Sequence, residues 1–330
     1  MSKPPETPSN PPADFVSLQT KIDKLAEDYV TNHPDIIDFM LKNDAALKGK
    51  KLEYVKAVIP RYLSVLAIAT HEEAHKLFTS GDTMKMIQAN QLAEAVHART
   101  GIDIHPATKI GEKCFFDHGT GIVVGETAEV GSGTVIYHGV TLGAYNKPDE
   151  TNTKIIAHRH PIVGHNCVIG TGAEILGHVK IGDHVRICPS AKLRGNDITV
   201  GNDVMVGNSA MIDGGSKNNI PLSIGNNVKI GSAAKIFAGN AIADNIKIGE
   251  GAVITANTGL IDRNIPAYCE VFLDKGTKEL KIVSLMEHDK EISTLQKTIE
   301  AIKTAIKIGN KEHRYNISYK SYGHEHGTGI

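Results

Sequence analysis

The sequence repeats in sixes over much of its length, and this period constrains the fold more than any other feature. From Val163 onward an aliphatic residue returns at every sixth position, with small slips. The members are Val163, Ile169, Ile175, Ile181, Ile187, Leu193, Val200, Val206, Ile212, Ile224, Ile230, Ile236, Ile242, Ile248 and Ile254. This period fits neither an α-helix, with about 3.6 residues per turn, nor a two-faced strand. It is typical of the hexapeptide β-helix, in which three short strands form each triangular coil around stacked aliphatic residues.

An earlier block keeps the same period, with one slip. The residues are Ile104, Ile110 and Phe116, followed by Val124, Val130, Ile136 and Leu142. Eight residues rather than six separate Phe116 from Val124. Insertions in such a prism become loops, often at a functional site. We therefore predict a left-handed parallel β-helix over residues 101–266, with a feature of interest just after Phe116.

The chain before residue 101 has helical periodicity instead. Apolar residues follow a helical stripe from Phe15 to Tyr29, and similar patterns cover 36–41, 52–77 and 84–97, with a possible break at Pro60. We predict an α-helical oligomerisation domain over residues 14–100. The Pro-rich, polar residues 1–13 are expected to be a disordered lead-in.

One short motif in this helical region suggests a metal site. His71-Glu72-Glu73-Ala74-His75 matches H-E-x-x-H, which on a helix places two imidazoles on one face where zinc could bind. Glu94 is a conceivable third ligand. Zinc proteases of this kind usually carry a sheet before the motif, whereas the upstream chain here is helical. We therefore favour an exposed, charged helical turn.

The hexads end after Pro266, and a different period follows. Leu285, Ile292, Ile299 and Ile306 are seven residues apart, with Leu295 and Ile302 three further on. Isoleucine at both core positions of a heptad favours three-stranded coiled coils. We predict a C-terminal helix over 267–310, either in a trimeric coiled coil or packed on its own prism. A flexible tail would follow over 311–330, which makes the overall fold class α+β.

Composition excludes several classes of partner. The formal net charge is -1 and no basic block stands out, so neither nucleic acid nor an anionic membrane surface is an expected partner. No apolar run is long enough for a membrane span. The 4 cysteines form no C-x-x-C pair, which argues against a zinc or disulfide framework and suits a reduced, cytoplasmic protein.

Four polar motifs occur in a fixed order around the early coils. They are Asp-Ile-His-Pro at 103–106, Asp-His-Gly-Thr-Gly-Ile-Val-Val-Gly-Glu-Thr at 117–127, Gly-Val-Thr-Leu-Gly at 139–143 and Arg-His-Pro at 159–161. Together they resemble the serine O-acetyltransferase family, which makes O-acetylserine from L-serine and acetyl-CoA. The resemblance is close over residues 101–195, loose over the helical region, and present again at the very C-terminus.

The resemblance implies roles for the residues of these motifs. His118 would be the general base that removes the proton of the serine hydroxyl, and Asp103 would hold its other ring nitrogen. Asp117 would bind the substrate ammonium. Arg159 and His160 would bind the carboxylate of the serine substrate, for which the planar guanidinium is well suited. Glu126 would tune the local charge, or lie in solvent as a loop acid, and Asp44 is the nearest match to an acid that the helical region contributes.

The resemblance also implies how the acetyl donor binds. Acetyl-CoA is a co-substrate that would lie in the groove between neighbouring prisms of a homotrimer or a dimer of trimers. Gly143, Ala144 and Thr171 would let the pantetheine arm approach the backbone, and Arg186 would meet a phosphate. No permanently bound cofactor and no metal is implied. A metal-dependent carbonic anhydrase of similar fold would need three converging histidines, and the Asp103, Asp117 and Arg159 set has no use in that chemistry.

The C-terminal sequence Gly-Thr-Gly-Ile resembles the family's partner-binding tail. Its terminal carboxylate, on Ile330, would enter the active site of O-acetylserine sulfhydrylase. The loop over 144–157 is longer than is common in the family, and His158 replaces an acid. Two alternatives stay open: an acyltransferase of this fold acting on another hydroxyl or amine, and a non-catalytic β-helix scaffold.

Overall fold

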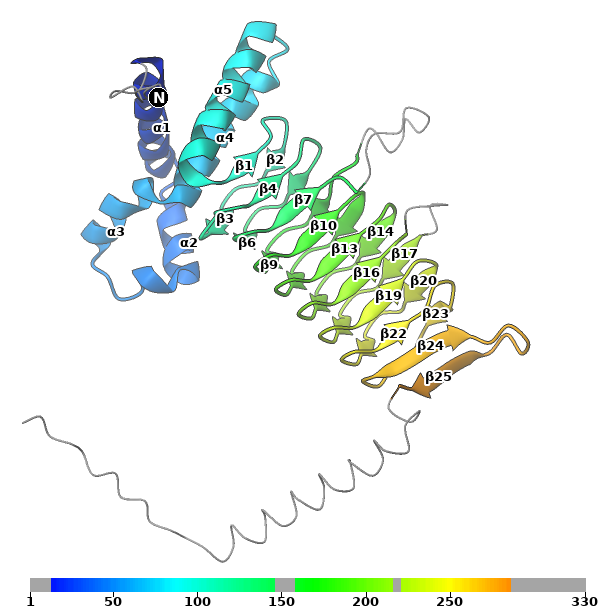
Figure 1. The fold of residues 1–330 in the computed structure, drawn as a ribbon. Helices are drawn as coiled ribbons and strands as arrows, with labels where there is room; N and C mark the ends of the chain where they lie inside the picture. The colour runs from blue at the N-terminus through cyan, green and yellow to red at the C-terminus, as the bar shows by residue number, and fades with distance from the viewer. Residues whose placement is uncertain (1–12, 146–157, 216–220, 286–330) are drawn as a thin grey trace, which may run out of the picture. The chain divides into compact units, whose positions relative to one another are not determined.

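The computed structural model describes residues 13–145, 158–215 and 221–285, and within them a helical region precedes a parallel β-helix (Figure 1). The expected order of helical and β-helical parts is confirmed. The helical elements are α1 (Ala13–Asn32), α2 (Asp35–Asn43), the 3-10 turn η1 (Ala45–Leu47), α3 (Leu52–Val58), the 3-10 turn η2 (Ile59–Arg61), α4 (Leu63–Phe78) and α5 (Thr83–Thr100). The helix expected over 52–77 is interrupted around Pro60, as the proline indicates.

The last helix, α5, leads directly into the first coil. The Asp82 carboxylate caps its start by accepting from the backbone N–H of Met84 at 2.8 Å and of Lys85 at 3.1 Å. Gly101 ends it in the left-handed region, with φ +69°. Two residues later, Asp103 begins strand β1.

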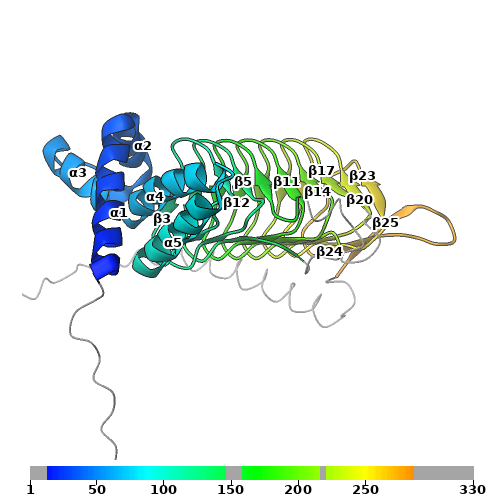
Figure 2. The ribbon, with the colours of Figure 1, turned by 90° about the horizontal axis from the view of Figure 1, so that it is seen from above.

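Three sheets of parallel strands form the faces of the β-helix, with β25 (Leu280–Ser284) added at the end of sheet A. Figure 2 shows the stacked coils from above. Sheet A contains β1 (Asp103–Ile104), β4 (Val123–Val124), β7 (Thr141–Gly143), β10 (Glu174–Leu176), β13 (Lys192–Arg194), β16 (Met211–Asp213), β19 (Lys235–Phe237), β22 (Val253–Ile254), β24 (Cys269–Leu273) and β25 (Leu280–Ser284). Sheet B contains β2 (Lys109–Ile110), β5 (Glu129–Val130), β8 (Ile162–Val163), β11 (Val179–Ile181), β14 (Ile198–Val200), β17 (Leu222–Ile224), β20 (Asn240–Ile242) and β23 (Gly259–Ile261). Sheet C contains β3 (Phe115–Asp117), β6 (Val135–Tyr137), β9 (Val168–Ile169), β12 (Arg186–Ile187), β15 (Met205–Val206), β18 (Lys229–Ile230) and β21 (Lys247–Ile248).

The aliphatic residues of the hexads stack in register inside the prism. In sheet C, Ile136 pairs with Ile169 and Ile169 with Ile187, and all three are 0% exposed. Each coil therefore buries its core residues only against the coils before and after it. The hexad prediction is confirmed along the whole described β-helix.

A ladder of polar side chains joins the coils at the corner between sheets B and C. The Asp183 carboxylate accepts from the His165 N–H at 2.7 Å, and the Asn202 amide oxygen accepts from the Asp183 N–H at 2.8 Å. The pattern continues with Asn226 and Asp244, whose side-chain oxygens accept from the N–H of Asn202 and Asn226 at 2.9 and 2.7 Å. These corner residues satisfy backbone donors that no strand can pair.

The region after the hexads differs from the expected helix. Residues 269–273 form β24, which pairs parallel with β22, and residues 280–284 form β25 alongside it. The Asp274 carboxylate closes the turn between them by accepting from the N–H of Gly276 at 2.9 Å and of Thr277 at 2.8 Å. The helix predicted from 267 is therefore wrong up to Ser284, because these strands extend the open end of sheet A. The heptads beyond Leu285 lie outside the described residues.

The H-E-x-x-H motif anchors α4 to the first coil. His71 Nε2 lies 3.1 Å from the carbonyl oxygen of Thr108, and His75 Nδ1 lies 2.8 Å from that of Pro106. His71 is only 6% exposed, and burial lowers its pKa to about 4. The expected exposed turn is therefore wrong for His71, because both imidazoles bond backbone carbonyls. Within the described residues, no helix is long and apolar enough to cross a membrane.

Candidate active site

The phase slip after Phe116 enlarges the corner between sheets C and A. The Gly121 N–H donates to the Gly101 carbonyl at 2.8 Å, so the preceding residues bulge out of the coil. His118 lies in this bulge with φ +57°, and its side chain is 76% exposed. Its ring contacts that of His138 on the next coil edge to face, at 6.0 Å between centroids. The slip therefore presents an imidazole to solvent.

Acidic groups from two parts of the chain approach His118. The Asp117 carboxylate lies 3.8 Å from His118 Nε2, and burial raises the pKa of Asp117. The negative charge of Asp44, from the helical region, raises it further. Burial and a hydrogen bond to Asp44 raise the pKa of Tyr62 to about 12. The helical region thus brings Asp44 to the corner that carries Asp117, with Tyr62 beside them.

Asp103 lies at the same corner, one coil earlier. It is the first residue of β1 and pairs with Val123 of β4, just beyond the bulge. Among the described residues, no hydrogen bond joins its carboxylate to His118, which instead lies beside Asp117. The negative charge of Asp103 acts on His105, which follows β1 directly.

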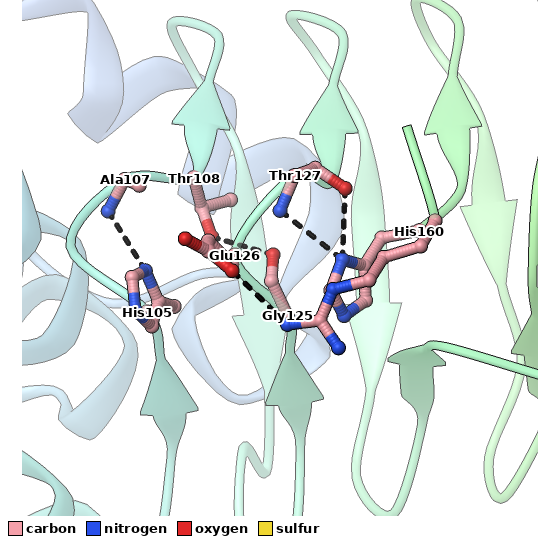
Figure 3. Close-up of polar contacts among 8 residues, drawn as sticks. His105, Ala107, Thr108, Gly125, Glu126, Thr127 and His160 are labelled. Atoms are coloured by element: carbon pink, nitrogen blue, oxygen red, sulfur yellow. Dashed lines mark hydrogen bonds and ion pairs between the residues drawn. The ribbon is translucent and has the colours of Figure 1, made fainter. Parts of the chain in front are cut away.

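A second polar group lies at the corner between sheets A and B. The Arg159 guanidinium donates to the Glu126 carboxylate at 3.0 Å, with 29% and 44% of the two side chains exposed. Glu129 pairs with Ile162, so Glu126 and Arg159, each three residues earlier, occupy equivalent places on successive coils. Figure 3 shows Glu126 between His105 and His160 along this corner.

His160 is held rigidly in this group. The Thr127 N–H donates to His160 Nδ1 at 3.1 Å, and the Thr127 hydroxyl lies 2.9 Å from the same nitrogen (Figure 3). Burial and the nearby positive charge of Arg159 lower the pKa of His160 to about 4. Gly125 makes room for the ring, because a Cβ there would come within 2.2 Å of it.

His105 is a member of this corner that the motif reading did not assign. The Ala107 N–H donates to His105 Nδ1 at 3.1 Å, and the ring packs edge to face on Phe78 of α4 at 5.4 Å. Burial lowers its pKa, and the charges of Glu126 and Arg159 also act on it. Its place in Asp-Ile-His-Pro was the available signal, because it follows β1 directly and begins the turn into the next sheet.

The predicted site residues therefore form two groups rather than one. Asp44, Asp117 and His118 precede β4 at one corner of the prism, and Glu126 follows β4 at the other, with Arg159 and His160. The two corners bound one face of the same coil. A single substrate that contacts both groups would have to meet them from two copies of the chain or across that face.

The residues expected to bind acetyl-CoA are also divided. Thr171 and Arg186 line one hollow of about 220 Å³ on the sheet C side, together with Tyr137 and Cys188. Gly143 ends β7 in sheet A, and Ala144 follows it, so these two lie at the corner that carries Glu126. Among the described residues, no three His, Cys, Asp or Glu side chains gather in a way that could hold a metal ion.

Comparison with known proteins identifies similar chains. A family model described as bacterial transferase hexapeptide (six repeats) matches residues 160–195. The serine acetyltransferase of Mycobacterium tuberculosis (strain ATCC 25618 / H37Rv) is 44% identical over 134 residues, or 41% of this chain and 54% of that protein. That of Staphylococcus aureus (strain Mu50 / ATCC 700699) is 40% identical over 130 residues, or 39% and 56%. The chain spans about half the length of these curated relatives.

Solved structures that align with part of this chain are also named serine acetyltransferases. Serine acetyltransferase 1 of Entamoeba histolytica, in complex with L-cysteine, is 32% identical and aligns over 55% of this chain and 73% of that one, with a TM-score of 0.41. A serine acetyltransferase of Brucella abortus strain S19, in complex with coenzyme A, is 27% identical over 58% and 80%, with a TM-score of 0.43.

Proposed function

We propose that this chain, which is similar to serine acetyltransferases and carries a segment matching the hexapeptide-repeat transferase model, transfers an acetyl group from acetyl-CoA to the hydroxyl of L-serine. The observation that carries the proposal is the bulge at the corner between sheets C and A. It presents the exposed His118 imidazole beside Asp117, and the helical region adds Asp44 there. An exposed imidazole flanked by acids suits general base catalysis on an amino alcohol.

In the proposed reaction His118 takes the proton of the serine hydroxyl as its oxygen attacks the thioester carbonyl. The C–O bond forms, the tetrahedral intermediate collapses, and the C–S bond breaks. The protonated imidazole then returns its proton to the coenzyme A thiolate, so no proton is gained or lost overall. Asp103 would orient His118 once substrate is bound, since catalytic hydrogen bonds often tighten only in the complex.

The two corners would divide recognition of the amino acid. Asp117 and Asp44 supply negative charge for the substrate ammonium, and Arg159 and His160 supply donors for its carboxylate. Because the groups lie at opposite corners of one prism, we propose that adjacent copies in a homotrimer, or in a dimer of trimers, complete each site. The helical region over 14–100 would contribute to that assembly.

Acetyl-CoA would enter along the sheet C side. The hollow lined by Thr171 and Arg186 is open to the pantetheine arm and offers a cation for a phosphate. Gly143 and Ala144, at the other corner, would face the same groove from a neighbouring copy. The C-terminal residue Ile330 lies outside the described residues, and its binding to O-acetylserine sulfhydrylase stays a prediction.

The proposal is tested by thiol release from acetyl-CoA in the presence of L-serine. The control panel contains L-threonine, ethanolamine and the free amine of glycine, which separates serine O-acetylation from transfer to another hydroxyl or amine. Release that depends on L-serine above the other acceptors supports the proposal. The absence of serine-dependent release contradicts it. A preference for another acceptor would show that the chain is an acetyltransferase whose substrate is not L-serine.

A further inference from the structure

The corner between sheets A and B holds two imidazoles in the same tautomer. A backbone N–H can only donate, so the contact from the Ala107 N–H at 3.1 Å leaves His105 Nδ1 without a proton. The contact from the Thr127 N–H at 3.1 Å does the same for His160 Nδ1. In each neutral ring the proton is therefore on Nε2, and that nitrogen is a hydrogen-bond donor.

The two rings lie on either side of Glu126, the partner of the Arg159 guanidinium (Figure 3). The charge of Arg159 acts on both His105 and His160, and the charge of Glu126 acts on both as well, so the four side chains share one small region. Within it the Glu126 carboxylate accepts from the Arg159 guanidinium at 3.0 Å. The region therefore combines a guanidinium with the N–H donors of two neutral imidazoles, a set of groups suited to carboxylate recognition.

The turn that carries His105 is fixed from behind by α4. His75 Nδ1 meets the Pro106 carbonyl at 2.8 Å, His71 Nε2 meets the Thr108 carbonyl at 3.1 Å, and Phe78 packs on the His105 ring. The Thr108 hydroxyl donates to the Gly125 carbonyl at 2.9 Å, which ties this turn to the coil that bears Glu126. The ring is thus held in one orientation before any ligand arrives, which lowers the entropy lost on binding.

We infer that His105 is a third carboxylate-binding residue of the amino-acid substrate, beside Arg159 and His160. The inference rests on the proposed function and extends it, because none of the motif-based roles involves His105. One competing role lies within reach of the same ring: Asp103, whose charge also acts on His105, could accept its Nε2–H. In that case His105 would affect the orientation of Asp103 and hence turnover, not the binding of the carboxylate.

Two substitutions distinguish the role of Nδ1, which accepts a hydrogen bond, from that of Nε2, which donates one. In His105→Asn the side-chain oxygen can still accept from the Ala107 N–H, and the distal donor is lost. In His105→Gln the amide N–H can replace the distal donor, and the bond to Ala107 is lost. We expect His105→Asn to raise KM for L-serine about tenfold, the effect of one charge-assisted hydrogen bond, and His105→Gln to stay within about threefold of wild type.

The readouts are KM for L-serine, KM for acetyl-CoA, turnover with ethanolamine, which lacks a carboxylate, and L-serine affinity by calorimetry. The inference predicts weaker L-serine binding in His105→Asn, with the acetyl-CoA KM and ethanolamine turnover unchanged. Unchanged L-serine affinity, or equal losses with ethanolamine, would overturn it. If wild type releases no thiol with L-serine, the proposed function fails by itself. Calorimetry then still decides the role of His105. If wild type binds no L-serine, the inference about His105 is overturned as well.

Discussion

Arg159 and Glu126 occupy equivalent positions on successive coils and are joined by a hydrogen bond of 3.0 Å. In the proposed enzyme the substrate carboxylate needs the same guanidinium, so Glu126 is a built-in competitor for it. The pair is partly exposed, with 29% and 44% of the side chains accessible, so its own contribution to stability is small, about 0–1 kcal/mol. Its main effect is expected on binding.

We therefore predict that Glu126→Gln lowers KM for L-serine by a few-fold, because the guanidinium is released for the substrate. The free energy of unfolding should change by less than about 1 kcal/mol. Steady-state kinetics at several salt concentrations measure the first and urea unfolding the second. Asp213→Asn is the matched control, since Arg194 donates to Asp213 at 2.9 Å across neighbouring coils away from the site. A raised KM in Glu126→Gln would show that Glu126 assists binding.

Gly125→Ala should damage the same corner by sterics alone. The new Cβ would lie within 2.2 Å of the His160 ring, which is buried and cannot move freely. We expect a loss of about 1–3 kcal/mol of stability from overpacking, and a KM for L-serine raised at least tenfold as the imidazole is displaced. Gly276→Ala, where the nearest atom would lie at 3.4 Å, is the control. Wild-type kinetics in Gly125→Ala would contradict the assignment of His160.

The buried histidine of α4 should make folding sensitive to acid. The pKa of His71 is lowered to about 4 from 6.5, so the unfolded chain binds a proton that the folded protein does not accept until about pH 4. Stability is therefore full above pH 6.5 and falls as the pH drops toward 4, by on the order of 3 kcal/mol from this residue.

Urea midpoints at pH 7.5 and 5 test this dependence. His71→Gln, whose amide can still donate to the Thr108 carbonyl, should reduce the difference between the two midpoints. The exposed His97→Gln should leave the difference as it is in wild type. An unchanged pH dependence in His71→Gln would show that this imidazole does not control acid sensitivity.

The corner ladder should contribute to stability and not to catalysis. Asn202 accepts from the Asp183 N–H at 2.8 Å, so Asn202→Ala leaves that donor to water. We expect a cost of about 0.5–1.5 kcal/mol, with kinetic constants unchanged. Asn208→Ala is the control, because Asn208 contributes to the coil stack through its backbone carbonyl. Equal urea unfolding midpoints for the two variants would show that the side-chain ladder does not contribute to stability.

The repeat made most of the fold predictable, because a buried aliphatic residue at every sixth position has few other structural explanations. Ile136 and Ile187 stack as their spacing indicates. The strands β24 and β25 were not foreseen, since residues 269–284 carry no hexads and their pairing depends on the open end of sheet A. The role of corner residues such as Asn202, whose side chain accepts from the backbone of the preceding coil, was not marked by any repeat in the sequence.

The sequence predicted which residues belong to the candidate site, but not how they are placed at the two corners of the prism. The motifs identified His118 and Arg159, and the slip after Phe116 indicated the bulge at His118. No sequence pattern could separate the two corners, because that follows from where β4 begins and ends. The pairing of Arg159 with Glu126 and the inclusion of His105 depend on contacts between coils. The burial of His71 depends on how α4 meets the first coil.

The proposed mechanism requires that the His118 imidazole accepts the serine proton during acetyl transfer. The most direct test is the rate of coenzyme A release from acetyl-CoA with saturating L-serine, for wild type and His118→Ala, with His138→Ala as the control for a neighbouring exposed imidazole. We predict serine-dependent release by wild type and by His138→Ala, and a loss of at least a hundredfold in His118→Ala, the usual scale of general base catalysis. Release by His118→Ala at the wild-type rate would contradict the account.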